Sequence, residues 1–101
     1  MKVEHPDSYE QLGAEFQFQW IGLLKDTLKR HGVEAELAQK ICGDFTFDFS
    51  MLIDQGEIDV DGKSYTPVIG FTEDEETLAI QPAEFDFHEY AFGNTSEAFG
   101  Q

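Results

Sequence analysis

Residues 44–53 read DFTFDFSMLI, and this stretch decides the fold predicted from the sequence. Large apolar side chains occupy every second position from Phe45 to Ile53. Most of the positions between them hold acidic or small polar residues. A period of two is typical of a strand with one buried face. The pattern therefore predicts a strand over Asp44–Ile53, the clearest in the chain.

The chain downstream of this stretch predicts four more strands in an antiparallel meander. Asp54-Gln55-Gly56 is a turn signal, and Ile58 and Val60 alternate with acidic residues in a short second strand. Asp61-Gly62 is a strong hairpin signal. The remaining strands are predicted over residues 63–71, 77–80 and 84–92, with a bulge near His88-Glu89 and a loose tail over 93–101.

Helical periodicity comes before the strands. Apolar residues recur at steps of three and four between Ser8 and His31, which predicts one long helix ended by Gly32. A short helix is predicted over Val33–Cys42. The expected fold is α+β, in one domain over residues 1–101 with an ordered core over 8–92. The predicted core contains Leu12, Phe16, Trp20, Leu23, Phe45, Phe47, Phe49, Ile58, Val60, Ile69, Leu78, Ile80, Phe85 and Phe87.

A helix followed by five short, sharply turned strands resembles the layout of Sm-like small barrels. The resemblance covers residues 8–92 and depends on the element order, the long first strand and the turns at 54–56 and 61–62. It implies a closed barrel, ring assembly and RNA binding through basic and aromatic loop positions. The loops of this chain are acidic, so nucleic acid is not an expected partner. An open sheet with a helix packed across one face is the alternative fold.

The charge of the chain is large and unevenly distributed. The net charge is −15 over 101 residues, and residues 41–101 carry fourteen acidic side chains against the single base Lys63. Such a surface repels nucleic acid and anionic membranes and attracts basic partners. Cys42 is the only cysteine, so no intramolecular disulfide is expected. No signal-peptide pattern or membrane span is readable, and a cytoplasmic location is expected.

Two patterns suggest metal chemistry, and each has a simpler interpretation. Asp54, Glu57, Asp59 and Asp61 before Gly62 resemble part of a calcium loop, but Val68 occupies the position of its final ligand. Acidic and histidine side chains would cluster if the first and last predicted strands paired. These are Asp44, Asp48, Glu84, Asp86 and His88. A solvated strand face explains both patterns better, so no catalytic, cofactor or metal residue and no enzyme activity are expected.

Two surfaces are expected to bind partners. The first helix carries more apolar residues than one stripe needs, which predicts a homo-oligomer. The interface candidates are Phe18, Trp20, Ile21, Leu24 and Leu28. The acidic turns predict contact with a basic protein. Their residues are Glu57, Asp59, Asp61, Glu73, Asp74, Glu75 and Glu76.

Three functions follow, in order of preference. The first is a non-catalytic interaction protein that self-associates through its N-terminal helix. The second is an acidic inhibitor, of the immunity or nucleic-acid-mimic kind, that blocks a basic site; such a complex weakens steeply with salt. The third is an Sm-like RNA-binding protein, as the resemblance implies.

Overall fold

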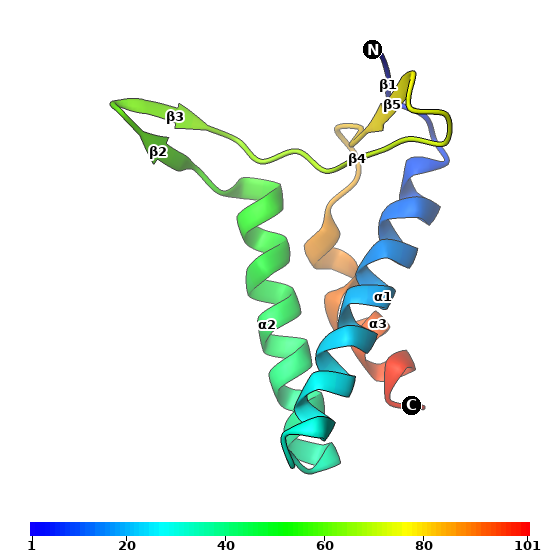
Figure 1. Ribbon diagram of the computed structural model, residues 1–101, viewed down its shortest axis with the longest axis vertical. Coiled ribbons are helices and arrows are strands. Elements are labelled where there is room, and N and C mark those ends of the chain that lie inside the picture. The colour runs from blue at the N-terminus through cyan, green and yellow to red at the C-terminus, as the bar shows by residue number, and fades with distance from the viewer.

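The computed structural model describes all residues 1–101 as a mixed α+β fold of three α-helices and two small sheets (Figure 1). Helices α1 (Tyr9–Arg30) and α2 (Ala35–Gln55) form a V that meets at the loop over residues 31–34. Helix α3 (Ala91–Ala98), which follows the 3₁₀-helix η1 (Phe87–Tyr90), packs against both. No helix is long and apolar enough to cross a membrane.

Helix α1 confirms the prediction of a long N-terminal helix. Its buried residues are Tyr9, Gly13, Gln17 and Ile21, which recur every fourth position and so lie on one side. The helix ends at Arg30, and Gly32 takes the left-handed conformation (φ 79°) that a chain needs to leave a helix.

Helix α2 shows that the strand predicted over Asp44–Ile53 is wrong. The predicted short helix over Val33–Cys42 instead continues to Gln55, and the Glu34 side chain caps its start by accepting the Leu37 N–H at 3.0 Å. The side chains that face the core are the small ones, spaced at three and four. They are Ala38, Cys42, Thr46, Ser50 and Ile53. The phenylalanines alternate along the sequence, but Phe45 and Phe49 share one side of the helix, whereas Phe47 faces Phe92 of α3.

The C-terminal region also differs from the prediction. Residues 84–92 form no strand, and residues 93–101 are not a loose tail, because α3 covers one side of the α1–α2 pair. Gly43 leaves room for the Phe92 ring, and Lys25 of α1 donates to the Ala98 carbonyl at 2.8 Å. Packing against α1 and α2 therefore orders the C-terminus.

The strands form two small sheets, so the five-stranded meander and the Sm-like barrel are both wrong. β1 (Lys2–Glu4) pairs in parallel with β5 (Thr77–Ile80), which pairs antiparallel with β4 (Gly70–Phe71). β2 (Ile58–Val60) and β3 (Lys63–Tyr65) form a separate hairpin that stands away from the helices (Figure 1).

The turn chemistry explains which strand predictions succeeded. The hairpin at Asp61-Gly62 is confirmed, with positive φ at both residues as a two-residue turn requires. The strand over Thr77–Ile80 is also confirmed. The predicted strand over residues 63–71 divides into β3 and β4, because Pro67 has no N–H to donate to a ladder. β1 is only three residues long and has no pattern that predicts it.

The core lies where α1, α2 and the segment before α3 meet. Its buried cluster contains Tyr9, Ile53, Phe85 and Phe87, with Trp20, Ile69, Phe71 and Tyr90 packed against it. Seven residues predicted to be in the core are exposed instead. These are Leu12, Phe16, Leu23, Phe45, Phe49, Ile58 and Val60. Five of them gather on one surface, because no element covers the side of the α1–α2 pair opposite to α3.

Candidate binding surfaces

The uncovered side of the α1–α2 pair carries an extensive apolar surface. We call it the aromatic face and define it by six exposed side chains: Leu12, Phe16 and Leu23 of α1, and Phe45, Phe49 and Leu52 of α2. Leu23 is 71% exposed, Phe45 49% and Phe16 41%. With roughly 200 Å² for each large side chain, the face exposes about 600 Å². That equals the largest patches of ordinary monomers, about 300–600 Å², which are often functional.

Aromatic rings connect the two helices across this face. The Phe16 ring lies 5.5 Å from Phe71 of β4 and 5.4 Å from Trp20. Trp20 lies 5.2 Å from Phe49, which stacks on Phe45 at 5.6 Å. The Trp20 Nε1–H donates to Thr46 Oγ1 at 3.2 Å, which fixes the indole between the helices. The row is therefore held in place by its own contacts before any partner arrives.

Acidic side chains border the aromatic face. Glu15 and Asp26 each lie three residues after a leucine of the face, and Asp48 lies three after Phe45 and four before Leu52. Such spacings make neighbours on a helix surface. These three exposed carboxylates form what we call the acidic rim. None of the three forms an ion pair, because the only ion pairs of the protein are Lys2–Glu4 and His88–Asp54.

A cavity of about 550 Å³ adjoins the sheet end of the face. Its wall contains Leu12 of the aromatic face and Phe71, whose ring contacts Phe16. Glu4, Glu73 and Asp74 supply three carboxylates to the same wall. Negative charge therefore continues beyond the acidic rim at this end.

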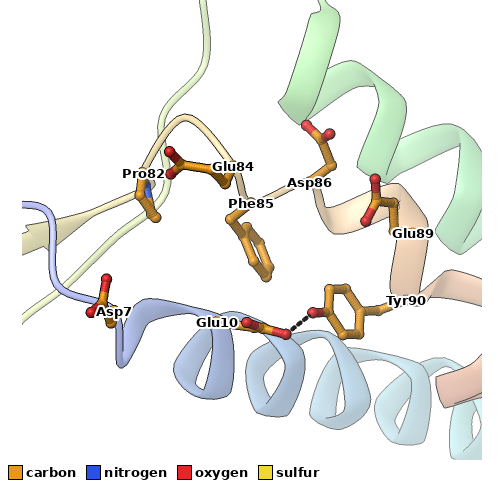
Figure 2. Close-up of a pocket in the computed structure, with 8 residues that line it drawn as sticks. All are labelled: Asp7, Glu10, Pro82, Glu84, Phe85, Asp86, Glu89 and Tyr90. Carbon is orange, nitrogen blue, oxygen red and sulfur yellow. Dashed lines mark hydrogen bonds between the residues drawn. The ribbon is translucent and has the colours of Figure 1, made fainter.

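A second acidic surface lies between the start of α1 and η1 (Figure 2). Its cavity of about 370 Å³ has an apolar wall made of Pro82, Phe85 and Tyr90. Five carboxylates surround this wall, those of Asp7, Glu10, Glu84, Asp86 and Glu89. The Tyr90 hydroxyl donates to Glu10, as the dashed line in Figure 2 marks. This bond, followed by burial, raises the pKa of Tyr90 to about 12. We call this surface the acidic pocket.

Asp54 forms the one close contact between a carboxylate and an imidazole. Its fully buried side chain accepts the backbone N–H groups of Phe87 at 3.0 Å and His88 at 2.9 Å. It also contacts His88 Nδ1 at 2.8 Å, and Gln81 Nε2 donates to it at 3.4 Å. Both oxygens are therefore occupied, and Asp54 caps η1 from the end of α2. We call this contact the Asp54 cap.

The cluster of carboxylates and imidazole that strand pairing would have produced does not form. Asp86 and His88 come together, but their third member is Asp54, with possible ligand atoms within 4.8 Å of one another. Asp44 and Asp48 lie on the exposed surface of α2 instead. Because protein donors already satisfy Asp54, a structural role explains this group. No such group forms among the residues of the predicted calcium loop.

The predicted interface residues are divided between the interior and the flanks of α1. Ile21 is fully buried in the protein's own core, and Trp20 is half-buried at the base of the aromatic face. Leu24 and Leu28 are also half-buried. Phe18 lines a cavity with Ala14 and Asn94, which reaches the aromatic face only at Leu12 and the acidic rim only at Glu15.

The predicted acidic residues are all exposed but do not form one surface. Glu57, Asp59 and Asp61 lie in or beside the β2–β3 hairpin, whereas residues 73–76 form the turn between β4 and β5. These segments lie at opposite sides of the molecule in Figure 1. Asp74 accepts the N–H groups of Thr77 and Glu76, which lowers the pKa of its carboxyl. Asp74 therefore shapes the turn as well as contributing charge.

Sequence reasoning missed the aromatic face because it placed most of these side chains in the core. One signal was present in the spacing of these residues. Phe45 and Phe49 fit a strand or a helix equally well, but Phe45, Phe49 and Leu52 together follow the four- and three-residue steps of a helix. Comparisons with protein-family models, curated proteins and solved structures found no match to this chain. Function is therefore inferred from the geometry of these surfaces.

Proposed function

We propose that this protein is a non-catalytic interaction protein that binds another protein through the aromatic face. The observation that carries the proposal is the row of rings from Phe71 to Phe45. Its members Phe16, Phe45 and Phe49 stay exposed, while α3 packs against the opposite side of the same helices. Large apolar patches bordered by polar groups mark sites of protein contact. Aromatic residues are also enriched at the centres of such contacts.

The other surfaces support a binding role rather than catalysis. The Asp54 cap uses its oxygens to hold backbone N–H groups, so this carboxylate is not free to work as a base on a substrate. The acidic pocket gathers carboxylates in one place but brings no imidazole or thiol into its wall. Cys42 is fully buried, and burial raises the pKa of its thiol, which disfavours the nucleophilic thiolate.

A second copy of the chain is the second candidate for the partner. The face exposes about 600 Å², close to the roughly 800 Å² per partner of a standard interface, whichever protein the partner is. Self-association through α1 was also expected from the sequence. Two copies, however, bring net charges of −15 together, and their acidic rims would meet across a symmetric contact.

Co-purification tests the proposal. The tagged full chain is expressed in its source cells as wild type, as Phe16→Ser/Phe45→Ser and as Phe92→Ser, a matched control. Phe92 is 54% exposed but lies on α3, away from the aromatic face. We expect a stoichiometric partner with wild type and Phe92→Ser, and its loss with the double variant. Light scattering of each pure protein identifies a second copy. An equal yield of partner from all three proteins would contradict the proposal.

A further inference from the structure

The binding surface differs from an ordinary apolar patch in its border. Three exposed carboxylates border the aromatic face, and the adjoining cavity adds three more beside Leu12 and Phe71. One base lies near this border. Arg30, at the end of α1, is on the same side of the helix as Leu12. The centre of the surface is therefore apolar and its border is negative.

The shape of the surface matches a helix. The α1–α2 pair already holds one helix, α3, on its opposite side. On the uncovered side, Phe16 and Leu23 form one row and Phe45 and Leu52 another, with the half-buried Trp20 between them. Leu12 and Leu23 are eleven residues apart in the sequence, so the face extends about 16 Å along α1. A partner helix of about three turns covers that length.

We infer that the aromatic face binds a cationic amphipathic helix of a different protein. This inference rests on the proposed function and names the partner's chemistry. The apolar side of that helix covers Phe16, Phe45 and Phe49, and its lysine or arginine side chains meet Glu15 and Asp48 of the acidic rim. Helix-in-groove recognition uses this combination of apolar anchors and flanking charge. Charge complementarity selects this partner over a second copy, which carries the same −15.

Designed peptides of about 18 residues, long enough to extend past the face, probe this chemistry. The first contains leucine and lysine, with the leucines on one side of a helix. The second has the same composition with the leucines spread around the helix, and the third has glutamine in place of lysine. Trp20 is the only tryptophan of the chain and lies at the face, so its fluorescence reports binding.

We expect the first peptide to bind at least about tenfold more tightly than either other peptide, and to weaken as salt rises. Glu15→Gln/Asp48→Asn removes two rim charges and is expected to weaken binding about fivefold. Glu84→Gln/Glu89→Gln removes the same charge from the acidic pocket and is expected to change binding less than about twofold. This pair of variants separates the acidic rim from the general negative charge of the protein.

Several outcomes would overturn the inference. Equal binding of the first two peptides would mean attraction by overall charge alone. If the glutamine peptide bound as tightly as the first peptide, the acidic rim would have no role in binding. The same conclusion would follow if Glu15→Gln/Asp48→Asn and Glu84→Gln/Glu89→Gln weakened binding equally. If no peptide binds although Phe16→Ser/Phe45→Ser loses its co-purified partner, this inference fails and the proposed function stands. If co-purification is unchanged by that variant, both fail. A co-purified species identified as a second copy also overturns the inference.

Discussion

The two sides of the α1–α2 pair differ in their side chains and in what covers them. The covered side is mostly small or polar, as at Thr46 and Ser50, whereas the uncovered side carries phenylalanines and leucines. On the covered side, Phe87 is fully buried and α3 closes the surface. On the uncovered side, Phe16 and Phe45 keep 41% and 49% of their surface exposed, although Phe71 and Phe49 contact their rings. The comparison teaches that apolar composition alone does not separate a folding core from a binding surface. A covering element within the same chain separates them.

The largest expected effect tests this difference directly. Phe87→Ala removes a ring in contact with Tyr9, Trp20 and Phe85, and is expected to lower the free energy of unfolding by about 3–5 kcal/mol. Phe45→Ala is expected to lower it by less than about 1 kcal/mol, because half of that side chain is already in water. Denaturant titration of both variants measures the gap. Equal losses would show that the aromatic face is covered in the isolated protein.

The next effect concerns the cap that holds the covering segment in place. Asp54→Ala leaves the N–H groups of Phe87 and His88 without their acceptor, and is expected to lower the free energy of unfolding by about 3 kcal/mol. Asp86→Ala is the control, because the Asp86 side chain makes no capping bond, and a change within about 0.5 kcal/mol is expected. The two variants are compared by denaturant titration. A loss from Asp86→Ala as large as that from Asp54→Ala would contradict the structural role of the cap.

Two glycines of α1 give a smaller effect of opposite sign. An added Cβ at Gly13 would lie 2.7 Å from the Phe85 ring, so Gly13→Ala is expected to destabilise the protein by about 1–3 kcal/mol. At Gly22 nothing lies within 4 Å of that atom. Gly22→Ala is expected to stabilise the protein by about 0.5–1 kcal/mol through helix propensity. Thermal unfolding compares them, and a shift of the same sign in both would contradict the difference in packing at these positions.

How much of the fold could be predicted depends on whether the apolar residues of a segment follow the spacing of a helix or of a strand. The long helix α1, the Asp61-Gly62 turn and the strand over Thr77–Ile80 follow from local patterns. Residues 44–53 satisfy a period of two in their phenylalanines, while Thr46, Ser50 and Ile53 continue the helical stripe of Ala38 and Cys42. Leu52 breaks the alternation, and that was the available signal for a helix.

The aromatic face could not be located from the sequence, because the position of α3 decides which side of the α1–α2 pair is covered. Residues 91–98 include glycine, asparagine, threonine and serine, which are poor helix formers. Their helix therefore depends on packing against α1 and α2, including the bonds from Asn94 to Ala14 and Gln17. Which side of α1 becomes exposed follows from that packing. The sequence alone placed Leu12, Phe16 and Leu23 inside for this reason.

The fourth effect appears only at alkaline pH. Burial, with a smaller contribution from Asp54, raises the pKa of Tyr9 to about 12, above the value near 10 of an unfolded chain. The neutral hydroxyl therefore stabilises the fold fully below pH 10, and this contribution is lost as pH rises to about 12. Tyr9→Phe is expected to unfold with less dependence on pH across that range. Wild type and variant curves that stay parallel from pH 10 to 12 would contradict this assignment.

The most direct measurement of the central claim is site-specific photo-cross-linking in the source cells. A photoreactive phenylalanine analogue replaces Phe45 on the aromatic face in one protein and Phe92 on α3 in another. Both side chains are about half exposed, so they sample the surroundings equally well. The account predicts one abundant adduct with a different protein from position 45 and only weak, scattered adducts from position 92. Equal adducts from the two positions would show that the aromatic face is not a binding surface.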